Sequence, residues 1–292
     1  MFDGLRRLAK GLAAHPIGRR RPVRSVANIV GWQVRSRLSP GPHQVKFING
    51  THLWARSGET GVTGNIYYGL HEFEDMAFVA HVLRPSDLFA DIGANAGSYT
   101  VIAAGVAGAR VIAIEPVPET IERLRANISL NGIEGQVRIE VCALTDKPGT
   151  IRFTTGHDTV NHVAADGETT GVIDVPARTA DELFCEDIPL IMKIDVEGHE
   201  AELLGGAAHL LSDPRLCALL VEISKPGAEP VMNTLTGNGF AVRCYDPSRR
   251  RLSVASPNIG KGNTLFVRIA SEARLARRTE EAKPILVHGE RF

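Results

Sequence analysis

Cysteine is scarce in this chain, which has four cysteines among 292 residues. They lie far apart, without a C-x-x-C pair or metal-ligand spacing, at Cys142, Cys185, Cys217 and Cys244. In a chain of this length, that distribution argues against a disulfide framework and against a zinc site. We therefore predict a cytoplasmic protein with buried, inert thiols.

The chain also lacks net charge, because 33 basic side chains balance 33 acidic ones. This balance gives no global signal for binding to nucleic acid or to a membrane. The charge is nevertheless uneven, since residues 1–38 hold nine basic residues and a single acid. We predict a basic N-terminal extension over residues 1–66 that contains a helix and short strands. In the helix, Leu5, Leu8 and Leu12 share one face. This helix would pack on the body of the protein or touch an anionic surface weakly, such as that of the inner membrane.

Long apolar runs are almost absent. The N-terminus has no extended apolar core of the kind found in a signal peptide. Residues 92–109 carry no charge and are long enough to raise the question of a membrane span. This run contains four glycines as well as Asn95, Ser98 and Thr100, so it is predicted to form a loop and a buried helix. Aromatic residues make up only 5% of the chain, and no stacking platform for a flat substrate stands out.

The most informative stretch of the chain is 88–100. An apolar run ends on Asp91, two glycines follow at Gly93 and Gly97, and a segment of small residues comes next. Glycines let the backbone turn sharply and approach a ligand closely, and a helix start offers unpaired N–H groups. The stretch therefore predicts a strand, a tight loop and a helix start that together bind a nucleotide-like ligand.

Strands and helices alternate over residues 67–270. The expected strands are 88–91, 110–115, 136–142, 189–195, 217–223, 240–245 and 263–269, and the expected helices are 73–83, 118–131, 179–184, 198–211 and 229–238. Helices of about a dozen residues between strands imply crossovers and a mainly parallel sheet with helices on both faces. The last two strands have no helix between them and should pair antiparallel.

The remaining segments are less regular in pattern. We expect a hairpin-like pair over 150–154 and 172–175. We also expect an irregular lead-in over 1–45, a strand over 47–53, a turn-rich stretch over 58–64 and a charged tail over 271–292.

Four of the predicted strands end on or near an acid, at Asp91, Glu115, Asp195 and Glu222. In an open parallel sheet, ligands bind outside the carboxyl ends of the strands. We therefore expect these four carboxylates to converge on one crevice.

The glycine loop and Glu115 together limit which ligands the site can bind. An acid at the end of the second strand can accept hydrogen bonds from the ribose hydroxyls of an adenosine ligand, either NAD or S-adenosylmethionine. A dinucleotide loop has the order G-x-G-x-x-G, but Asn95 stands at the second glycine position here. S-adenosylmethionine, which has no phosphate, fits this loop better, and Asp91 and Asn95 would meet its ammonium and carboxylate groups.

A second cluster, KIDVEGHE at 193–200, places five ionisable residues at a strand end and helix start. A capped helix with a solvated first turn would need only Asp195 or Glu197. Lys193, however, alternates with Asp195 inside an apolar strand, where a buried ammonium group is costly unless it is paired. This argues for a functional use of the cluster.

Five segments together resemble the FkbM family of S-adenosylmethionine-dependent methyltransferases: DIGANAG at 91–97, EP at 115–116, AL at 143–144, KIDVEGHE at 193–200 and VEI at 221–223. The resemblance covers about residues 68–269. It implies the α/β fold of the class I methyltransferases, a Rossmann-like sheet of seven strands with the last antiparallel. It also implies methyl transfer, most often to a hydroxyl oxygen of a sugar or natural-product acceptor.

The resemblance also implies site residues. Residues 91–100 would hold the methionine part of the cofactor. Glu115, with Pro116 and Val117, would hold the ribose, and Glu72 would face the amino-acid end. The full cofactor-binding set is Glu72, Asp91, Ile92, Gly93, Ala94, Asn95, Gly97, Ser98, Tyr99, Thr100, Glu115, Pro116, Val117, Cys142, Ala143, Asp195 and Val196. The resemblance implies that Asp195 and Glu197 lie near the transferable methyl group. With Lys193 and His199 of the same cluster, they are the predicted catalytic residues.

An alcohol acceptor needs help to lose its proton, and a general base contributes about 10²–10⁴-fold. The candidate bases are His162, Asp195, Glu197, His199 and Glu222. His199 lies at a predicted helix start, where the helix dipole would favour its neutral form. Asp195 and Glu222 could instead hold a divalent cation, although no metal site is favoured.

The acceptor itself stays open. Relatives often have a serine-rich stretch after residue 154, whereas this chain has GHDTVNHV at 156–163. A small molecule or glycan is expected as partner, nucleic acid is not, and the protein would be a monomer or homodimer. Two other classes remain, an NAD-linked oxidoreductase and a module that binds an adenosine cofactor without catalysis.

Overall fold

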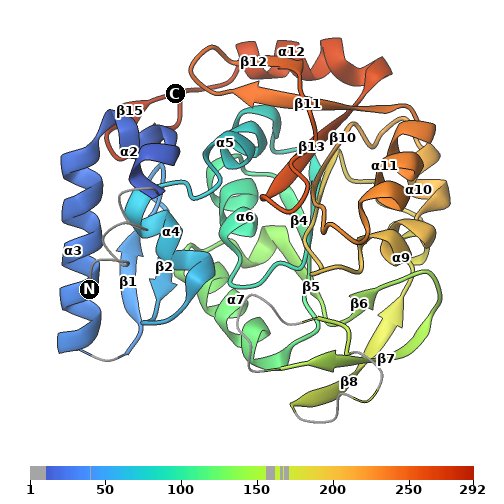
Figure 1. Ribbon diagram of the computed structural model, residues 1–292, viewed down its shortest axis with the longest axis horizontal. Helices are drawn as coiled ribbons and strands as arrows, with labels where there is room; N and C mark the ends of the chain where they lie inside the picture. The colour runs from blue at the N-terminus through green and yellow to red at the C-terminus, as the bar shows by residue number, and fades with distance from the viewer. Residues whose placement is uncertain (1–10, 40, 156–161, 165–166, 168–170) are drawn as a thin grey trace.

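The computed structural model describes residues 11–39, 41–155, 162–164, 167 and 171–292, around a mixed eight-stranded sheet in the order β12-β11-β13-β10-β9-β3-β4-β5 (Figure 1). Its strands are β3 (Leu88–Ile92), β4 (Arg110–Ile114), β5 (Val137–Glu140), β9 (Ile191–Ile194), β10 (Ala218–Glu222), β11 (Phe240–Asp246), β12 (Arg251–Val254) and β13 (Asn263–Arg268). The five strands from β5 to β10 in this order are parallel, and β13 lies antiparallel between β10 and β11. The predicted fold class is confirmed. The sheet has an eighth strand because β12 forms in the connection after β11.

β3 shows why helices cover both faces of the sheet. All five of its residues are buried, and Phe89 joins one apolar cluster whereas Leu88 and Ala90 join the other. Successive side chains of a strand point to opposite faces, so each face requires its own cover. The first cluster includes side chains of α5 (Phe73–Val82), α6 (Ser98–Val101), η1 (Ile102–Val106) and α7 (Pro118–Leu130). The second includes side chains of α8 (Ala180–Leu183), α9 (Glu200–Gly205), α10 (Ala208–Ser212) and α11 (Ala228–Gly237).

The single helix predicted over 198–211 is therefore two short helices, α9 and α10. The chain changes direction at Gly206, where a Cβ atom would lie 2.2 Å from the carbonyl oxygen of Thr145. α9 ends after six residues, where this close packing against Thr145 leaves no room for a side chain.

The N-terminal region is more regular than predicted. It contains α2 (Pro16–Arg20), α3 (Pro22–Leu38), β1 (His43–Lys46), β2 (His52–Ala55) and α4 (Thr60–Tyr68). The irregular lead-in expected over 1–45 is wrong for the part of it that the structure describes, where α2 and α3 form. The strand expected over 47–53 is replaced by β1 and β2, and most of the turn-rich stretch expected over 58–64 belongs to α4. The predicted helix face with Leu5 and Leu8 lies outside the described residues.

α3 was missed because its buried face is weakly apolar. The residues that it buries are Ser25, Ile29, Trp32 and Ser36, and two of these are small and polar. Strong helical periodicity needs apolar residues at most of the core-facing positions.

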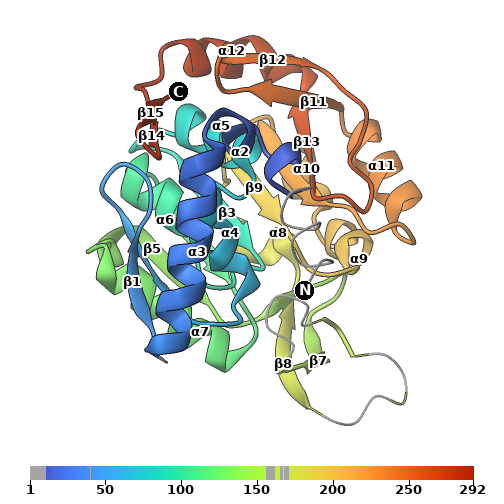
Figure 2. The ribbon, with the colours of Figure 1, turned by 60° about the vertical axis from the view of Figure 1, so that its left-hand side comes forward.

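The C-terminal residues also pack against the body. They form α12 (Glu272–Glu280) and a hairpin of β14 (Leu286–Val287) and β15 (Glu290–Arg291). Leu275 and Phe292 share an apolar cluster with Ile17 and Trp32, and Figure 2 shows the hairpin beside the start of α3. The charged tail expected over 271–292 is therefore a packed segment.

A small second sheet projects from the body (Figure 2). It contains β6 (Ala143–Leu144), β7 (Gly149–Thr154) and β8 (Val172–Arg178), and β7 pairs antiparallel with β8. The predicted hairpin is confirmed, but most of the unusual loop at 156–163 lies outside the described residues. The chain also forms two short 3₁₀ helices, η2 (Glu134–Gln136) and η4 (Ile269–Ser271).

No helix in the described part of the chain is long and apolar enough to cross a membrane. Cys142 and Cys217 are buried as predicted, whereas Cys185 and Cys244 are exposed. The prediction of buried thiols is therefore wrong for these two. Cys244 is exposed because it lies on β11, where only Phe240 and Tyr245 are buried.

Candidate functional site

A cavity of about 930 Å³ lies at the carboxyl ends of β3, β4, β9 and β10. The four strand-end acids, at Asp91, Glu115, Asp195 and Glu222, all line it, as predicted. Glu72, Glu74, Asp75 and Glu197 line it as well. Eight carboxyl groups thus face the cavity, and Lys193, Arg19 and Lys261 are the lysine and arginine residues that line it among those described.

The glycine loop is shaped by close backbone contact. The N–H groups of Gly93 and Ala94 both donate to the carbonyl oxygen of Ile114, each at 3.0 Å. Gly93 has a φ of 74°, and a Cβ atom there would lie 1.9 Å from the carbonyl oxygen of Asp195. Only glycine can occupy that position, so the loop is fixed between β4 and the end of β9. Asn95 also has a positive φ, of 49°, which asparagine tolerates better than most residues.

Glu115 is buried at the end of β4 and held by backbone donors. Its Oε2 accepts from the N–H of Asn95 at 3.0 Å, and its Oε1 accepts from the N–H of Val117 at 3.1 Å. Burial raises the pKa of this carboxyl group to about 7. Each oxygen retains capacity for a further hydrogen bond, as two vicinal hydroxyls would require.

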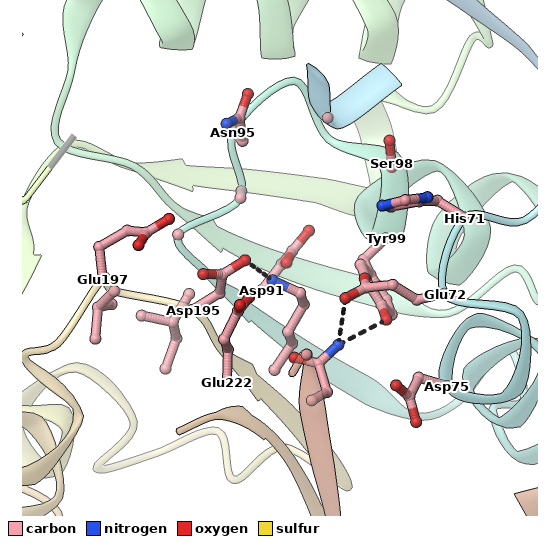
Figure 3. Close-up of a pocket in the computed structure, with 18 of the residues that line it drawn as sticks. His71, Glu72, Asp75, Asp91, Asn95, Ser98, Tyr99, Asp195, Glu197 and Glu222 are labelled. Carbon is pink, nitrogen blue, oxygen red and sulfur yellow. Dashed lines mark hydrogen bonds and ion pairs between the residues drawn. The ribbon is translucent and has the colours of Figure 1, made fainter. Parts of the chain in front are cut away.

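Lys193 is the buried cation among these acids. Its side chain is 5% exposed, and its Nζ lies 2.7 Å from Asp195 Oδ2 and 5.2 Å from the ring centroid of Tyr99 (Figure 3). The expectation that a buried lysine must be paired is confirmed. Asp91 is fully buried, accepts from Thr100 Oγ1 at 2.6 Å, and has a pKa raised by burial. Lys193 is thus placed to neutralise part of the acidic cluster.

A network that the sequence did not reveal lies on the other side of the cavity. Asn263, on β13, donates through Nδ2 to Glu72 Oε1 at 2.8 Å and to Tyr99 Oη at 3.3 Å (Figure 3). Its Oδ1 is buried and has no hydrogen-bond partner within the described residues. Burial, with Glu72 and Glu74 nearby, raises the pKa of Asp75 to about 8. A polar residue beginning an apolar strand was the available clue to Asn263.

The predicted bases differ in their surroundings. His199 lines the cavity, but its Nε2 lies 3.0 Å from Thr145 Oγ1, and burial lowers its pKa. Glu197 is exposed and has a φ of 50°. Glu222 is half-buried, and its side chain makes no hydrogen bond or ion pair within the described residues. Burial and the neighbouring Asp195 raise the pKa of Glu222 to about 7.

Most of the predicted cofactor set lines the cavity, including Ile92, Ser98, Pro116, Cys142, Ala143 and Val196. Gly97, Thr100 and Val117 do not line it. Thr100 and Val117 instead hold Asp91 and Glu115 in place, and a Cβ atom on Gly97 would lie 2.5 Å from the side chain of Leu124. The set therefore combines wall residues with residues that position them.

The N-terminal segment of the wall was not predicted: Gly11, Ala14, His15, Pro16 and Arg19 reach the cavity from there. The segment with Asn258, Lys261 and Gly262, before β13, was not predicted either. Phe153 and Val163 reach the cavity from the projecting hairpin, whose loop was expected on the acceptor side. His15 stacks on Tyr68 with 4.2 Å between ring centroids, and its Nε2 lies 2.8 Å from the carbonyl oxygen of Leu70. Burial lowers the pKa of His15 to about 4, so it is neutral near pH 7. No cluster of three or more His, Cys, Asp or Glu side chains in the described residues is arranged to hold a metal ion.

Comparison with known proteins agrees with this arrangement. Residues 91–242 match the methyltransferase FkbM domain family. The chain is 36% identical over 85 residues to 31-O-demethyl-FK506 methyltransferase FkbM of Streptomyces tacrolimicus, covering 28% of this chain and 32% of that protein. It is 31% identical over 151 residues to the hexuronic acid methyltransferase AglP of Haloferax volcanii, covering 49% of this chain and 58% of that protein. The matches thus span about a third and somewhat more than half of these two curated relatives.

A solved structure, methyltransferase FkbM from Methylobacillus flagellatus KT, is also similar. It is 15% identical with a TM-score of 0.42, covering 64% of this chain and 47% of that one.

Proposed function

Because the chain belongs to the FkbM methyltransferase domain family, we propose that it transfers a methyl group from S-adenosylmethionine to a hydroxyl oxygen of a sugar or natural-product acceptor. The observation that carries the proposal is the acidic lining of the cavity. Eight carboxyl groups face it, and Lys193 is the buried lysine beside them. Such a site favours a cationic ligand, because opposite charges in a partly desolvated cavity attract strongly.

The residues present fit this cofactor. The buried Oδ1 of Asn263 has no partner in the described chain, and it lines the cavity next to Glu72. An ammonium group at the amino-acid end of the cofactor would supply the missing donor. Glu115 would accept from the ribose hydroxyls, and Cys142 and Ala143 would border the adenine. When bound, the cofactor supplies an activated methyl group on a positively charged sulfur.

Glu222 is the residue that we propose as general base. Its carboxylate is free of partners in the described chain and faces the cavity beside Asp195 (Figure 3). The pKa of about 7 lets Glu222 accept a proton from the acceptor hydroxyl near neutral pH. Asp195 is already paired with Lys193, and the ring of His199 is turned toward Thr145.

The two curated relatives suggest the acceptor class. One is named for 31-O-demethyl-FK506 and the other for a hexuronic acid. Both names describe a methyltransferase, and the name of the first specifies an oxygen as the methylated atom. We propose by analogy that this chain methylates a hydroxyl-bearing glycan or natural product.

Calorimetric titration tests the cofactor. We expect S-adenosylhomocysteine to bind and NAD not to bind. Asp91→Asn should weaken binding roughly 10- to 100-fold, because it removes a buried charge from the site. Asp187→Asn, on an exposed carboxylate paired with Arg110, is the matched control and should leave binding unchanged. Binding of NAD instead would support an oxidoreductase.

A transfer assay tests the reaction. The protein is incubated with S-adenosylmethionine labelled at the methyl group and with fractionated glycans and small molecules from the host. Glu222→Gln should lower label transfer by about 10²–10⁴-fold while affinity for S-adenosylhomocysteine changes little. Tight cofactor binding without any transfer would support a non-catalytic module.

A further inference from the structure

α3 presents an apolar stripe to solvent. Its residues Val23, Val26, Val30, Val34 and Leu38 are 82%, 39%, 53%, 50% and 80% exposed. At 3.6 residues per turn they fall within about a third of the helix circumference. Nine large apolar side chains are exposed in the described part of the protein, and five of them are in this stripe. Clustering of this kind marks an interaction surface, whereas scattered exposed apolar residues do not.

The sequence segment that contains the stripe carries charge of one sign. Residues 4–58 contain eleven lysines and arginines and no aspartate or glutamate, although the whole chain is neutral. α3 itself carries Arg24, Arg35 and Arg37, all of which are exposed. Arg20 and Arg21, just before it, lie within ion-pair distance of Glu290 and are partly neutralised.

From this combination we propose that α3 lies flat on an anionic lipid bilayer, with the stripe among the headgroups and its arginines against the lipid phosphates. An interfacial helix has an apolar face and a polar face rich in basic residues, and both attractions add. α3 has 17 residues, and its opposite side is anchored to the body through Ile29 and Trp32. Figures 1 and 2 both show it along the outside of the molecule.

Two other occupants explain less of the surface. Nucleic acid would bind the arginines through its phosphates, but its polar phosphates and sugars would not bind the exposed valines. A second copy of the chain would bring one basic surface against another, which is unfavourable. The bilayer accounts for both the apolar and the basic groups.

The location links this surface to the cavity. α2 runs directly into α3, and Pro16 and Arg19 of α2 line the cavity. Docking through α3 would therefore hold the cavity wall next to the membrane. The proposal does not depend on the proposed methyl transfer.

Vesicle co-sedimentation of the full chain tests it. We compare vesicles of phosphatidylcholine alone with vesicles that also contain phosphatidylglycerol. Binding should require the anionic lipid and weaken with added salt. Val30→Asp/Val34→Asp should lower partitioning roughly tenfold or more, because it places charge in the apolar stripe. Val254→Asp, at a position 81% exposed on β12, is the matched control and should bind like the unchanged protein.

Other outcomes overturn the proposal. Equal binding to both vesicle types, or binding unaffected by Val30→Asp/Val34→Asp, would exclude this surface. A dimer in light scattering that the double variant dissociates would assign the stripe to a second copy. Release of the protein from vesicles by a small excess of RNA would assign the arginines to nucleic acid. If the double variant does not fold, Arg24→Gln/Arg35→Gln gives the same test from the charged side.

Discussion

The cavity at the strand ends and the outer surface of α3 carry opposite charges in different surroundings. The cavity gathers eight carboxyl groups, and Asp91 and Glu115 among them are buried. The α3 surface gathers arginines that are exposed to water. The negative charge of the cavity and the positive charge of the α3 surface offset each other within a net charge of zero, so the net charge reveals neither region.

The difference lies in the cost of each charge. In the cavity, burial raises the pKa of Asp75, Asp91, Glu115 and Glu222, so the fold holds these carboxyl groups at an energetic cost. On α3, solvent and salt screen each arginine, and its effect on folding is small. Substitutions in the cavity should therefore change stability and ligand binding, whereas substitutions on α3 should change only surface binding.

Lys193→Met should give the largest effect. It leaves Asp195 without its partner at 2.7 Å and removes the cation that offsets Asp91. Removing one partner of a buried ion pair costs about 3–5 kcal/mol. Urea unfolding measures this loss of unfolding free energy. Adding Asp195→Asn should restore part of it, and a double variant as unstable as Lys193→Met alone would contradict the pairing.

Gly93→Ala should give the second largest loss of stability. Its Cβ would lie 1.9 Å from the carbonyl oxygen of Asp195 at a φ of 74°, so both contact and backbone strain oppose it. We expect a loss of about 3 kcal/mol and of binding to S-adenosylhomocysteine. Gly132→Ala is the matched control, because φ is 62° but, apart from its chain neighbours, no residue lies within 4 Å of the added group. Thermal unfolding should show only about 1 kcal/mol of loss in the control.

The two regions also differ in how far the sequence predicted them. The acids at 91, 115, 195 and 222 were predictable because parallel strands end at one edge of a sheet. Asn263 was not predictable, because its role depends on an antiparallel strand that places it across from Glu72. The helix α3 was not predictable either, because its buried face has only two large apolar residues. Local patterns therefore predicted the strand ends, and long-range packing decided the rest of the cavity wall.

Raising the pH should weaken the ligand-free fold through the cavity. The pKa of Asp75 is about 8 in the fold and near 4 when unfolded, so the folded protein binds more protons between these values. The stability that Asp75 contributes is therefore fully present below about pH 4 and is lost as pH rises through 8. Between pH 7 and pH 9 this one group should lower the free energy of unfolding by about 1.4 kcal/mol. Asp75→Asn should reduce the difference between the free energies of unfolding in urea at pH 7 and at pH 9. An unchanged difference would show that other groups cause the pH dependence.

Arg35→Gln should give the smallest effect on the fold and a selective one on the surface. Arg35 is exposed, so its loss should change unfolding free energy by less than about 0.5 kcal/mol. Each basic residue near an anionic membrane contributes about 1 kcal/mol, which is roughly a fivefold change in partitioning to phosphatidylglycerol vesicles. Lys147→Gln, in the turn before β7 with a side chain 84% exposed, should leave partitioning unchanged. If both variants weakened binding equally, the attraction would follow total charge, and the separation of an acidic cavity from a basic docking surface would fail.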